Sequence, residues 1–229
     1  MGTRGTAAKD EFNGALGVRK VSKDIVSETV KKAINHEINP NYGKGYVYSI
    51  NCALCTTAFA LAARGYDVEA MPKDKTWRGF NSVFDVDYSN PDNYIVGNGV
   101  GHFLGSPTSW DIHLKYGVPK SDIPFAKKGA SANAALIESK MKQWGNGAVA
   151  AMSVKWKAGN SAHSVALVND KGTIKIVDAQ TGKSTTDIKG YLSQTRANWT
   201  TVTRLDNAPV KQNIPSSTLS KVVKVKGSK

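Results

Sequence analysis

Residues 161–178 constrain the fold more than any other part of the chain. Two runs of alternating apolar residues flank a turn sequence at residues 169–172, and this pattern predicts a β-hairpin with one buried face. In one register of this hairpin, His163 and Asp178 face each other on the buried side. If the turn is centred one residue later, Gln180 lies opposite His163 instead. Either register brings a polar side chain to the imidazole.

A second pattern predicts a helix that begins at Cys52. Asn51 is a favourable N-cap residue, and Gly65 is well suited to the end of the helix. The apolar residues that recur at helical spacing are Leu54, Ala58, Leu61 and Ala62. Backbone N–H groups and the helix dipole stabilise negative charge at an N-terminus, so this is where a nucleophilic thiolate is best supported. Cys55, one turn further in, is expected to be more buried and less reactive.

The two cysteines allow three interpretations. Most buried cysteines simply fill a core, and a Cys-x-x-Cys pair can act in redox chemistry. The third interpretation is catalytic, because a Cys on a helix N-terminus, then a His on a strand, then an Asp on the neighbouring strand is the chain order of papain-like thiol enzymes. A carboxylate beside a buried imidazole orients the ring and stabilises its charged form, although such a pair can also be purely structural. We favour the catalytic interpretation because it accounts for Cys52, His163 and Asp178 together.

The remaining pattern predicts an α+β fold. Further helices are expected at 22–38, 131–144 and 188–195, and further strands at 66–71, 148–156 and 199–205. Residues 73–130 are rich in Gly, Pro, Asn and Asp and predict a long loop-rich insertion, of the kind that forms lids or binding loops. We expect a flexible N-terminal arm at 1–20, one domain at 21–206 that includes this insertion, and a basic C-terminal tail at 207–229.

The charge of the chain is strongly positive. Lys and Arg number 31 against 18 Asp and Glu, which gives a net charge of +13. Residues 207–229 hold five Lys and no acid, so we expect an exposed arm that aids solubility or contacts nucleic acid or an acidic protein electrostatically. No zinc-finger, P-loop or RNA-binding motif supports sequence-specific binding.

No metal or cofactor is expected, because His36, His102 and His113 lack partners at ligand spacing. No apolar run approaches the roughly 20 residues of a membrane helix, so we expect no membrane contact. Residues 1–13 lack the apolar stretch of a signal peptide. We therefore expect the protein to act in the cytoplasm.

The stretch that begins at Asn51 resembles the papain-fold toxin family, whose members are predicted glutamine deamidases. The family pattern Asn-Cys-x-x-Cys-x-x-Ala is matched at 51–58, and Arg-Gly-aromatic-Asp-Val followed by a proline is matched at 64–72. A second block matches at Ala162-His163 and at the Asp-x-Gln-x-Gly sequence of 178–182.

This resemblance implies a papain-like fold, in which the catalytic helix packs on an antiparallel sheet. It implies that Cys52 is the nucleophile, His163 the general base and acid, and Asp178 the residue that orients His163. Asn51, Cys55 and Gln180 are possible accessory residues. Papain-type enzymes proper place a Cys-x-x-Cys in this helix and use the second cysteine, but the position at the helix terminus favours Cys52.

The implied activity is hydrolysis of glutamine side chains in a target protein. The same residues acting on a backbone amide would make a cysteine peptidase. Similar domains occur in bacterial toxins and effectors and in phage head proteins, so the setting is either a delivered effector or a virion-associated protein. A different class of function is also open, an inactive papain-like structural module that contacts nucleic acid through its basic tail.

Overall fold

The computed structural model describes residues 16–17, 19–75, 79–98 and 107–226. Six antiparallel strands form the central sheet in the order β2-β7-β3-β4-β5-β6. The strands are β2 (Tyr94–Ile95), β3 (Val149–Lys155), β4 (Ala162–Asp170), β5 (Thr173–Asp178), β6 (Lys183–Thr185) and β7 (Thr201–Arg204). The expected α+β class with an antiparallel sheet is confirmed.

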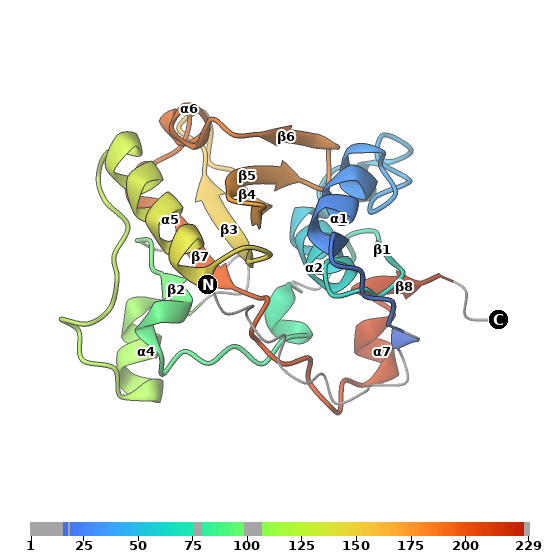
Figure 1. Ribbon diagram of the computed structural model, residues 1–229, viewed down its shortest axis with the longest axis horizontal. Coiled ribbons are helices and arrows are strands. Elements are labelled where there is room, and N and C mark those ends of the chain that lie inside the picture. The colour runs from blue at the N-terminus through green and yellow to red at the C-terminus, as the bar shows by residue number, and fades with distance from the viewer. Residues whose placement is uncertain (1–15, 18, 76–78, 99–106, 227–229) are drawn as a thin grey trace.

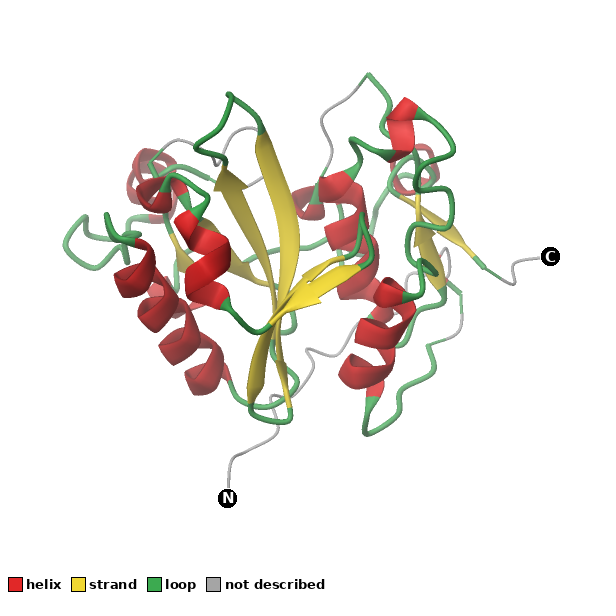
Figure 2. Cartoon of the chain, turned by 90° about the horizontal axis from the view of Figure 1, so that it is seen from above, coloured by secondary structure: helices red, strands yellow, loops and turns green. Residues whose placement is uncertain are grey.

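Helices cover both faces of this sheet (Figures 1 and 2). One face packs against α5 (Ala130–Trp144) and α6 (Ile188–Ser193). The other face packs against α1 (Ile25–Ile34) and α2 (Cys52–Ala62). Alternation along the strands explains the division, since Val165 and Leu167 of β4 join the first core while Ala166 and Val168 join the second.

The register of the hairpin follows the second of the two predicted alternatives. The pairs are Asp170 with Thr173 and Leu167 with Ile176, so the turn is centred on Lys171 and Gly172 rather than one residue earlier. Both turn residues have positive φ, 56° and 89°, as a two-residue hairpin turn that matches the strand twist requires. The first register, with His163 directly opposite Asp178, is therefore wrong.

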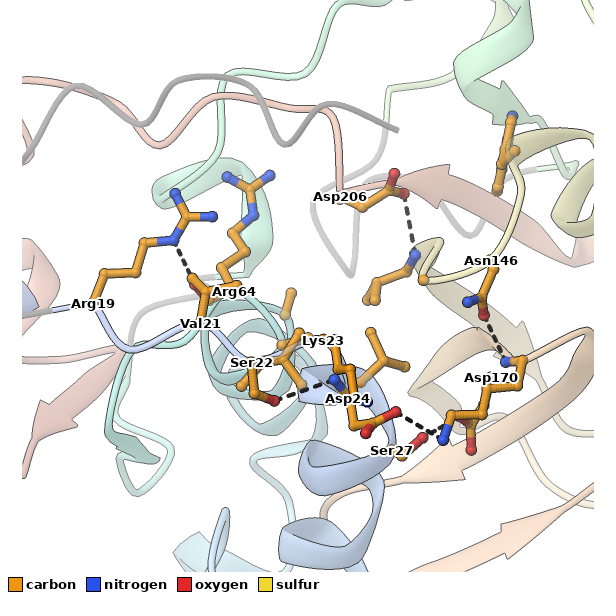
Figure 3. A pocket seen from close by; sticks show the side chains of 18 residues that line it. Arg19, Val21, Ser22, Lys23, Asp24, Ser27, Arg64, Asn146, Asp170 and Asp206 are labelled. Atoms are coloured by element: carbon orange, nitrogen blue, oxygen red, sulfur yellow. Dashed lines mark hydrogen bonds and ion pairs between the residues drawn. The ribbon is translucent and has the colours of Figure 1, made fainter. Parts of the chain in front are cut away.

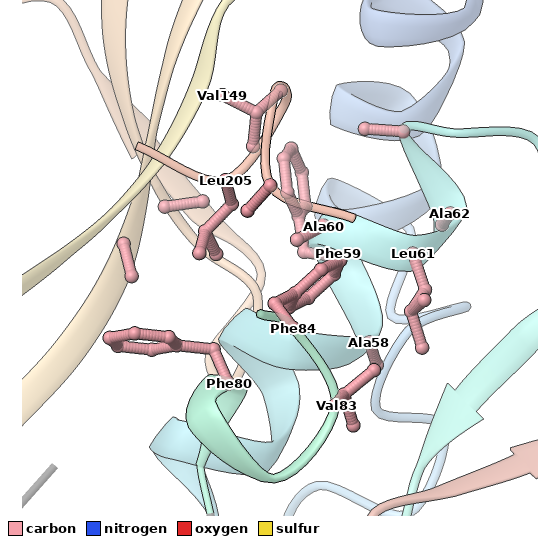
Figure 4. Close-up of a cluster of buried hydrophobic side chains, with 14 of the residues drawn as sticks. Ala58, Phe59, Ala60, Leu61, Ala62, Phe80, Val83, Phe84, Val149 and Leu205 are labelled. Atoms are coloured by element: carbon pink, nitrogen blue, oxygen red, sulfur yellow. The ribbon is translucent and has the colours of Figure 1, made fainter. Parts of the chain in front are cut away.

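Helix α2 is deeply enclosed. All nine of its residues from 54 to 62 are buried. Figure 4 shows the residues that surround Phe59, among them Phe80, Phe84 and Leu205. Burial on all sides gives the helix little freedom to shift, and this holds the residue at its N-terminus in place.

The other elements agree with the predicted ranges except at their ends. Strands β1 (Val68–Ala70), β3 and β7 and helix α6 lie within the ranges expected for them. Helix α1 is shorter than the predicted 22–38. Helix α5 begins at Ala130 after Gly129 as N-cap, so Ser131 does not cap it.

The segment 73–130 is less loop-like than expected in its described parts. It contains η3 (Phe80–Ser82), η4 (Pro91–Asn93), β2 and α4 (Ser109–Tyr116). A capping box at Thr108 and Asp111 starts α4. Phe80 and Phe84 are buried against α2, so this segment contributes to the core.

The expectation of an exposed C-terminal arm is wrong for residues 207–226. This stretch forms α7 (Ser216–Leu219) and β8 (Val223–Val225), and β8 pairs with β1. Its apolar residues are buried, namely Val210, Ile214, Leu219, Val222 and Val223. The lysines dominated the composition of this stretch, but the apolar residues between them anchor it. Of the predicted N-terminal arm, residues 1–15 and 18 lie outside the described residues, while Leu16 is buried.

Two short 3-10 helices complete the fold, η2 (Tyr46–Tyr48) before α2 and η5 (Ala197–Trp199) before β7. Among the helices described, none has the length and apolar character needed to cross a membrane.

Candidate active site

Three elements bring the predicted residues Cys52, His163 and Asp178 together. Cys52 is the first residue of α2, His163 is the second residue of β4, and Asp178 is the last residue of β5. The pairing of β4 with β5 ends at Ala166 and Val177, so His163 lies beyond the last pair of the ladder. There Cys52 interacts with the imidazole, since a hydrogen bond with the Cys52 side chain is one of the causes that raise the pKa of His163.

His163 and Asp178 contact each other directly. The imidazole Nε2 lies 2.9 Å from the Asp178 Oδ2, and both side chains are largely buried. In the observed register Asp178 reaches His163 diagonally along the shared face rather than straight across. Because Nε2 is occupied by Asp178, Nδ1 is the ring nitrogen that remains for Cys52.

The Asp178 carboxylate is held by the turn that follows it. Oδ2 accepts a bond from the Thr181 hydroxyl at 2.8 Å, and Oδ1 accepts bonds from the backbone N–H groups of Gln180 and Thr181 at 3.1 and 3.3 Å. Burial by itself would raise the pKa of this carboxyl, but the hydrogen bond with His163 and these turn donors hold the pKa below its ordinary value. Asp178 is therefore a fixed negative charge behind the imidazole.

That charge determines the protonation of His163. Burial by itself would lower the pKa of His163, but the hydrogen bonds with Asp178 and Cys52 outweigh burial and raise the pKa to about 10. The ring is therefore an imidazolium at neutral pH, with an acid on one side and a thiol on the other. A cysteine beside an imidazolium is the arrangement found around cysteine nucleophiles.

Two aromatic residues that the sequence interpretation missed complete the surroundings of His163. Trp156 stacks on the imidazole with 6.0 Å between ring centroids and 26° between ring planes, and Tyr191 of α6 packs on Trp156 at 5.5 Å. The pairing of β3 with β4 could have predicted the position of Trp156. Val154 is the cross-strand partner of His163, and Trp156 lies two residues further along the chain on the same face. The Tyr191 hydroxyl is buried without a hydrogen-bond partner among the described residues. Burial, with the charges of Asp178 and Cys52, raises its pKa, so it stays protonated.

Asn51 and Gln180 lie beside the site and bind each other. The Gln180 Nε2 donates to the Asn51 Oδ1 at 3.2 Å, and the Asn39 Nδ2 donates to the Gln180 carbonyl at 3.1 Å. The Asn51 Nδ2 donates to the Met71 carbonyl at 3.0 Å, so the Asn51 side chain does not cap α2 although Asn51 occupies the N-cap position. This buried network ties the loop before Cys52 to the turn after Asp178. The sequence interpretation missed Asn39, which is distant in the chain.

Cys55 differs from Cys52 in exposure. Cys55 is 1% exposed, whereas Cys52 is partly exposed, and neither forms a disulfide. Burial raises the pKa of the Cys55 thiol, and the charges of Cys52 and Asp178 add to the effect. Cys52, and not Cys55, is the cysteine whose interaction raises the pKa of His163.

A cavity of about 540 Å³ lies elsewhere, between the start of α1 and the turn of the β4–β5 hairpin (Figure 3). An ion pair of 2.7 Å between Lys171 and Asp24 lies at its edge. The residues that line it include no Cys or His. Within the described ranges, no three His, Cys, Asp or Glu side chains gather as they would around a metal ion.

Comparison with known protein families gives a match. A family model described as papain fold toxin 1, glutamine deamidase, matches residues 50–183, which is more than half of the chain. No curated protein and no solved structure matches the chain.

Proposed function

Since the chain belongs to the papain fold toxin 1 family of glutamine deamidases, we propose that it deamidates glutamine side chains of a target protein with Cys52, His163 and Asp178 as its catalytic triad. The family match includes all three positions. The observation that carries the proposal is the order of contacts, from a thiol at a helix N-terminus to an imidazolium to a buried carboxylate.

In the first half of the reaction, the Cys52 sulfur attacks the carbon of the side-chain carboxamide. A tetrahedral intermediate forms, and its oxyanion needs donors close to the sulfur. The backbone N–H of Cys52 has no partner within α2, because it belongs to the first turn of the helix, so we assign it as one donor. His163 gives its proton to the amide nitrogen, the carbon–nitrogen bond breaks, and ammonia leaves a thioester on Cys52.

In the second half, water attacks the thioester carbon. His163, now neutral, accepts a proton from this water, and Asp178 stabilises the imidazolium that results. The carbon–sulfur bond breaks, and glutamate is released with the Cys52 thiolate restored. Asp178 orients the ring throughout, while Trp156 packs on its face. The network of Asn51 and Gln180 has a positioning role, since it holds the two loops that carry the triad.

The experiment is deamidation of short synthetic glutamine peptides, followed by mass spectrometry and ammonia release. Deamidation adds roughly 1 Da and leaves the peptide chain whole, whereas peptidase activity cleaves it. We expect Cys52→Ala to abolish the reaction. The matched variant Cys55→Ala should keep activity if it folds, because Cys55 lies in the core. Full activity of Cys52→Ala on a peptide that the unaltered protein converts would refute the assignment.

We also propose that the protein acts in the cytoplasm of the cell that contains its target, as a delivered toxin or effector. The deamidase family of the chain supports a protein substrate. The corresponding test is expression in the cytoplasm of a model host cell, where the unaltered protein should inhibit growth and Cys52→Ala should not. Equal inhibition by both proteins would contradict this proposal.

A further inference from the structure

Exposed apolar side chains gather in the loop that leads to Cys52. Tyr42, Tyr46, Val47 and Ile50 are 40%, 77%, 40% and 39% exposed. We call residues 41–50 the entry loop. Large apolar side chains that lie exposed together mark contact sites for other molecules more often than scattered ones do.

The entry loop is held firmly beside the site. Asn39 and Asn51, which flank it, bind each other and the turn that follows Asp178. The Lys73 backbone N–H donates to the Val47 carbonyl at 2.9 Å, and the Tyr42 ring stacks on His36 at 5.8 Å. The exposed side chains are therefore presented on an ordered support, which reduces the entropy lost when a partner binds.

Three exposed lysines lie in the segments that flank the candidate site. Lys44 lies in the entry loop, Lys157 follows Trp156, and Lys183 is the cross-strand partner of Asp178. All three are exposed, and among the described residues none of them has a carboxylate partner. Other lysines do have one, namely Lys140, Lys171, Lys175 and Lys224.

Acidic side chains are scarce in the same region. The segments that flank the triad are 41–50, 71–75, 156–161 and 179–183, and they contain one acid, Asp74. Charges that are not compensated within the protein remain available to a partner and steer its approach.

We propose that the entry loop and the lysines Lys44, Lys157 and Lys183 form a docking face for an acidic protein surface, and that this surface carries the glutamine to be deamidated. The inference rests on the proposed function, because it takes the docked protein as the substrate of the site. Tyr46 is the central apolar contact of the docking face, and the three lysines give the face its preference for acidic partners.

A protein partner fits this face better than a nucleic acid does. Val47 and Ile50 are aliphatic and cannot stack on bases, whereas apolar contacts inside a polar rim are typical of protein interfaces. The adjacent thiol is placed to react with a carboxamide, which proteins supply.

The test uses three short fluorescent peptides that share a central glutamine and have acidic, neutral or basic flanks. Their binding to the Cys52→Ala protein is measured by fluorescence anisotropy, so that turnover does not disturb the equilibrium. At about 50 mM salt we expect the acidic peptide to bind at least about tenfold more tightly than the basic one, and this preference should largely disappear at about 500 mM salt.

Two pairs of variants locate the binding. A triple variant in which Lys44, Lys157 and Lys183 are all replaced by Glu should bind the acidic peptide at least about tenfold more weakly. Lys142→Glu, an exposed lysine on α5, should change binding less than about twofold. Tyr46→Ala should also weaken binding of the neutral peptide. Trp110→Ala, which removes another exposed aromatic side chain, should leave this binding unchanged.

Three binding results would overturn the inference. They are equal binding of the acidic and basic peptides, a Lys142→Glu effect as large per charge as that of the triple variant, and tighter binding of a single-stranded oligonucleotide than of the acidic peptide at the same face. Equal deamidation of all three peptides by the unaltered protein would also refute the docking face while the proposed function stands. Selective binding without any deamidation would support the face and count against the proposed function.

Discussion

Replacement of Asp178 by Asn removes the charge behind His163 and keeps the shape of the side chain. In the protein, Asp178 accepts the bond from His163 at 2.9 Å and three further bonds from the turn that follows. An amide at this position can still occupy the space, but it carries no negative charge to stabilise an imidazolium.

The magnitude follows from the protonation of His163. Its pKa rises from an ordinary 6.5 to about 10, and at about 1.4 kcal/mol for each factor of ten this is roughly 5 kcal/mol of extra proton binding. Asp178 is the foremost cause of the increase, ahead of Cys52, and burial opposes both. We therefore expect the pKa of His163 in Asp178→Asn to fall below about 8 and kcat/KM to fall by at least about 100-fold.

The assay is an NMR titration of the histidine rings in protein labelled with nitrogen-15. Loss of one set of signals in His163→Ala identifies the resonances of that ring. Asp170→Asn is the matched control, because Asp170 lies at the opposite end of β4 and pairs with Lys175 at 2.6 Å. The control should leave the titration of His163 unchanged. An imidazole that still titrates above about pH 9 in Asp178→Asn would refute the reasoning.

Three further predictions concern the stability of the protein. The pKa of His163 is raised on folding, so its stabilising effect should be full below about pH 6.5 and should be lost as the pH rises toward 10. Urea unfolding should therefore show a free energy of unfolding that falls over this range. A free energy of unfolding that does not change with pH would contradict this prediction. Gly97→Ala should destabilise the fold by about 1–3 kcal/mol, because an added Cβ would lie 2.5 Å from the backbone of Trp199, and a change under about 0.5 kcal/mol in the same assay would be inconsistent with this contact. Gln180→Ala should lower the free energy of unfolding by about 1–3 kcal/mol, because the buried hydrogen bond to Asn51 is lost. The same substitution should slow deamidation. Unchanged stability would show that the network is dispensable.

Much of the fold follows from local patterns in the sequence. The alternation of apolar residues in β4 and β5 predicts their faces, and the helical spacing after Asn51 predicts α2. The register was harder to predict, because it depends on whether Lys171 adopts a positive φ, and lysine has no strong preference for that conformation. The composition of residues 207–226 predicts an exposed arm wrongly, since five buried apolar residues outweigh the lysines among them.

The residues of the candidate site can likewise be divided into those that the sequence predicts and those that it does not. Cys52, His163 and Asp178 could be proposed because each lies in an element with a clear pattern. Trp156 and Asn39 could not, since their roles depend on contacts between segments far apart in the chain. Such contacts leave no periodic signal in one sequence.

The proposed triad draws its members from opposite sides of the sheet. Cys52 begins the helix on one side, while His163 lies on the strand face that packs against α5 and α6. A chain in which only one of the two layers has assembled thus holds a thiol without its base, or a base without its thiol. Under the proposed function, both layers must therefore assemble before Cys52 and His163 can act together, and a partly folded chain lacks the reactive pair.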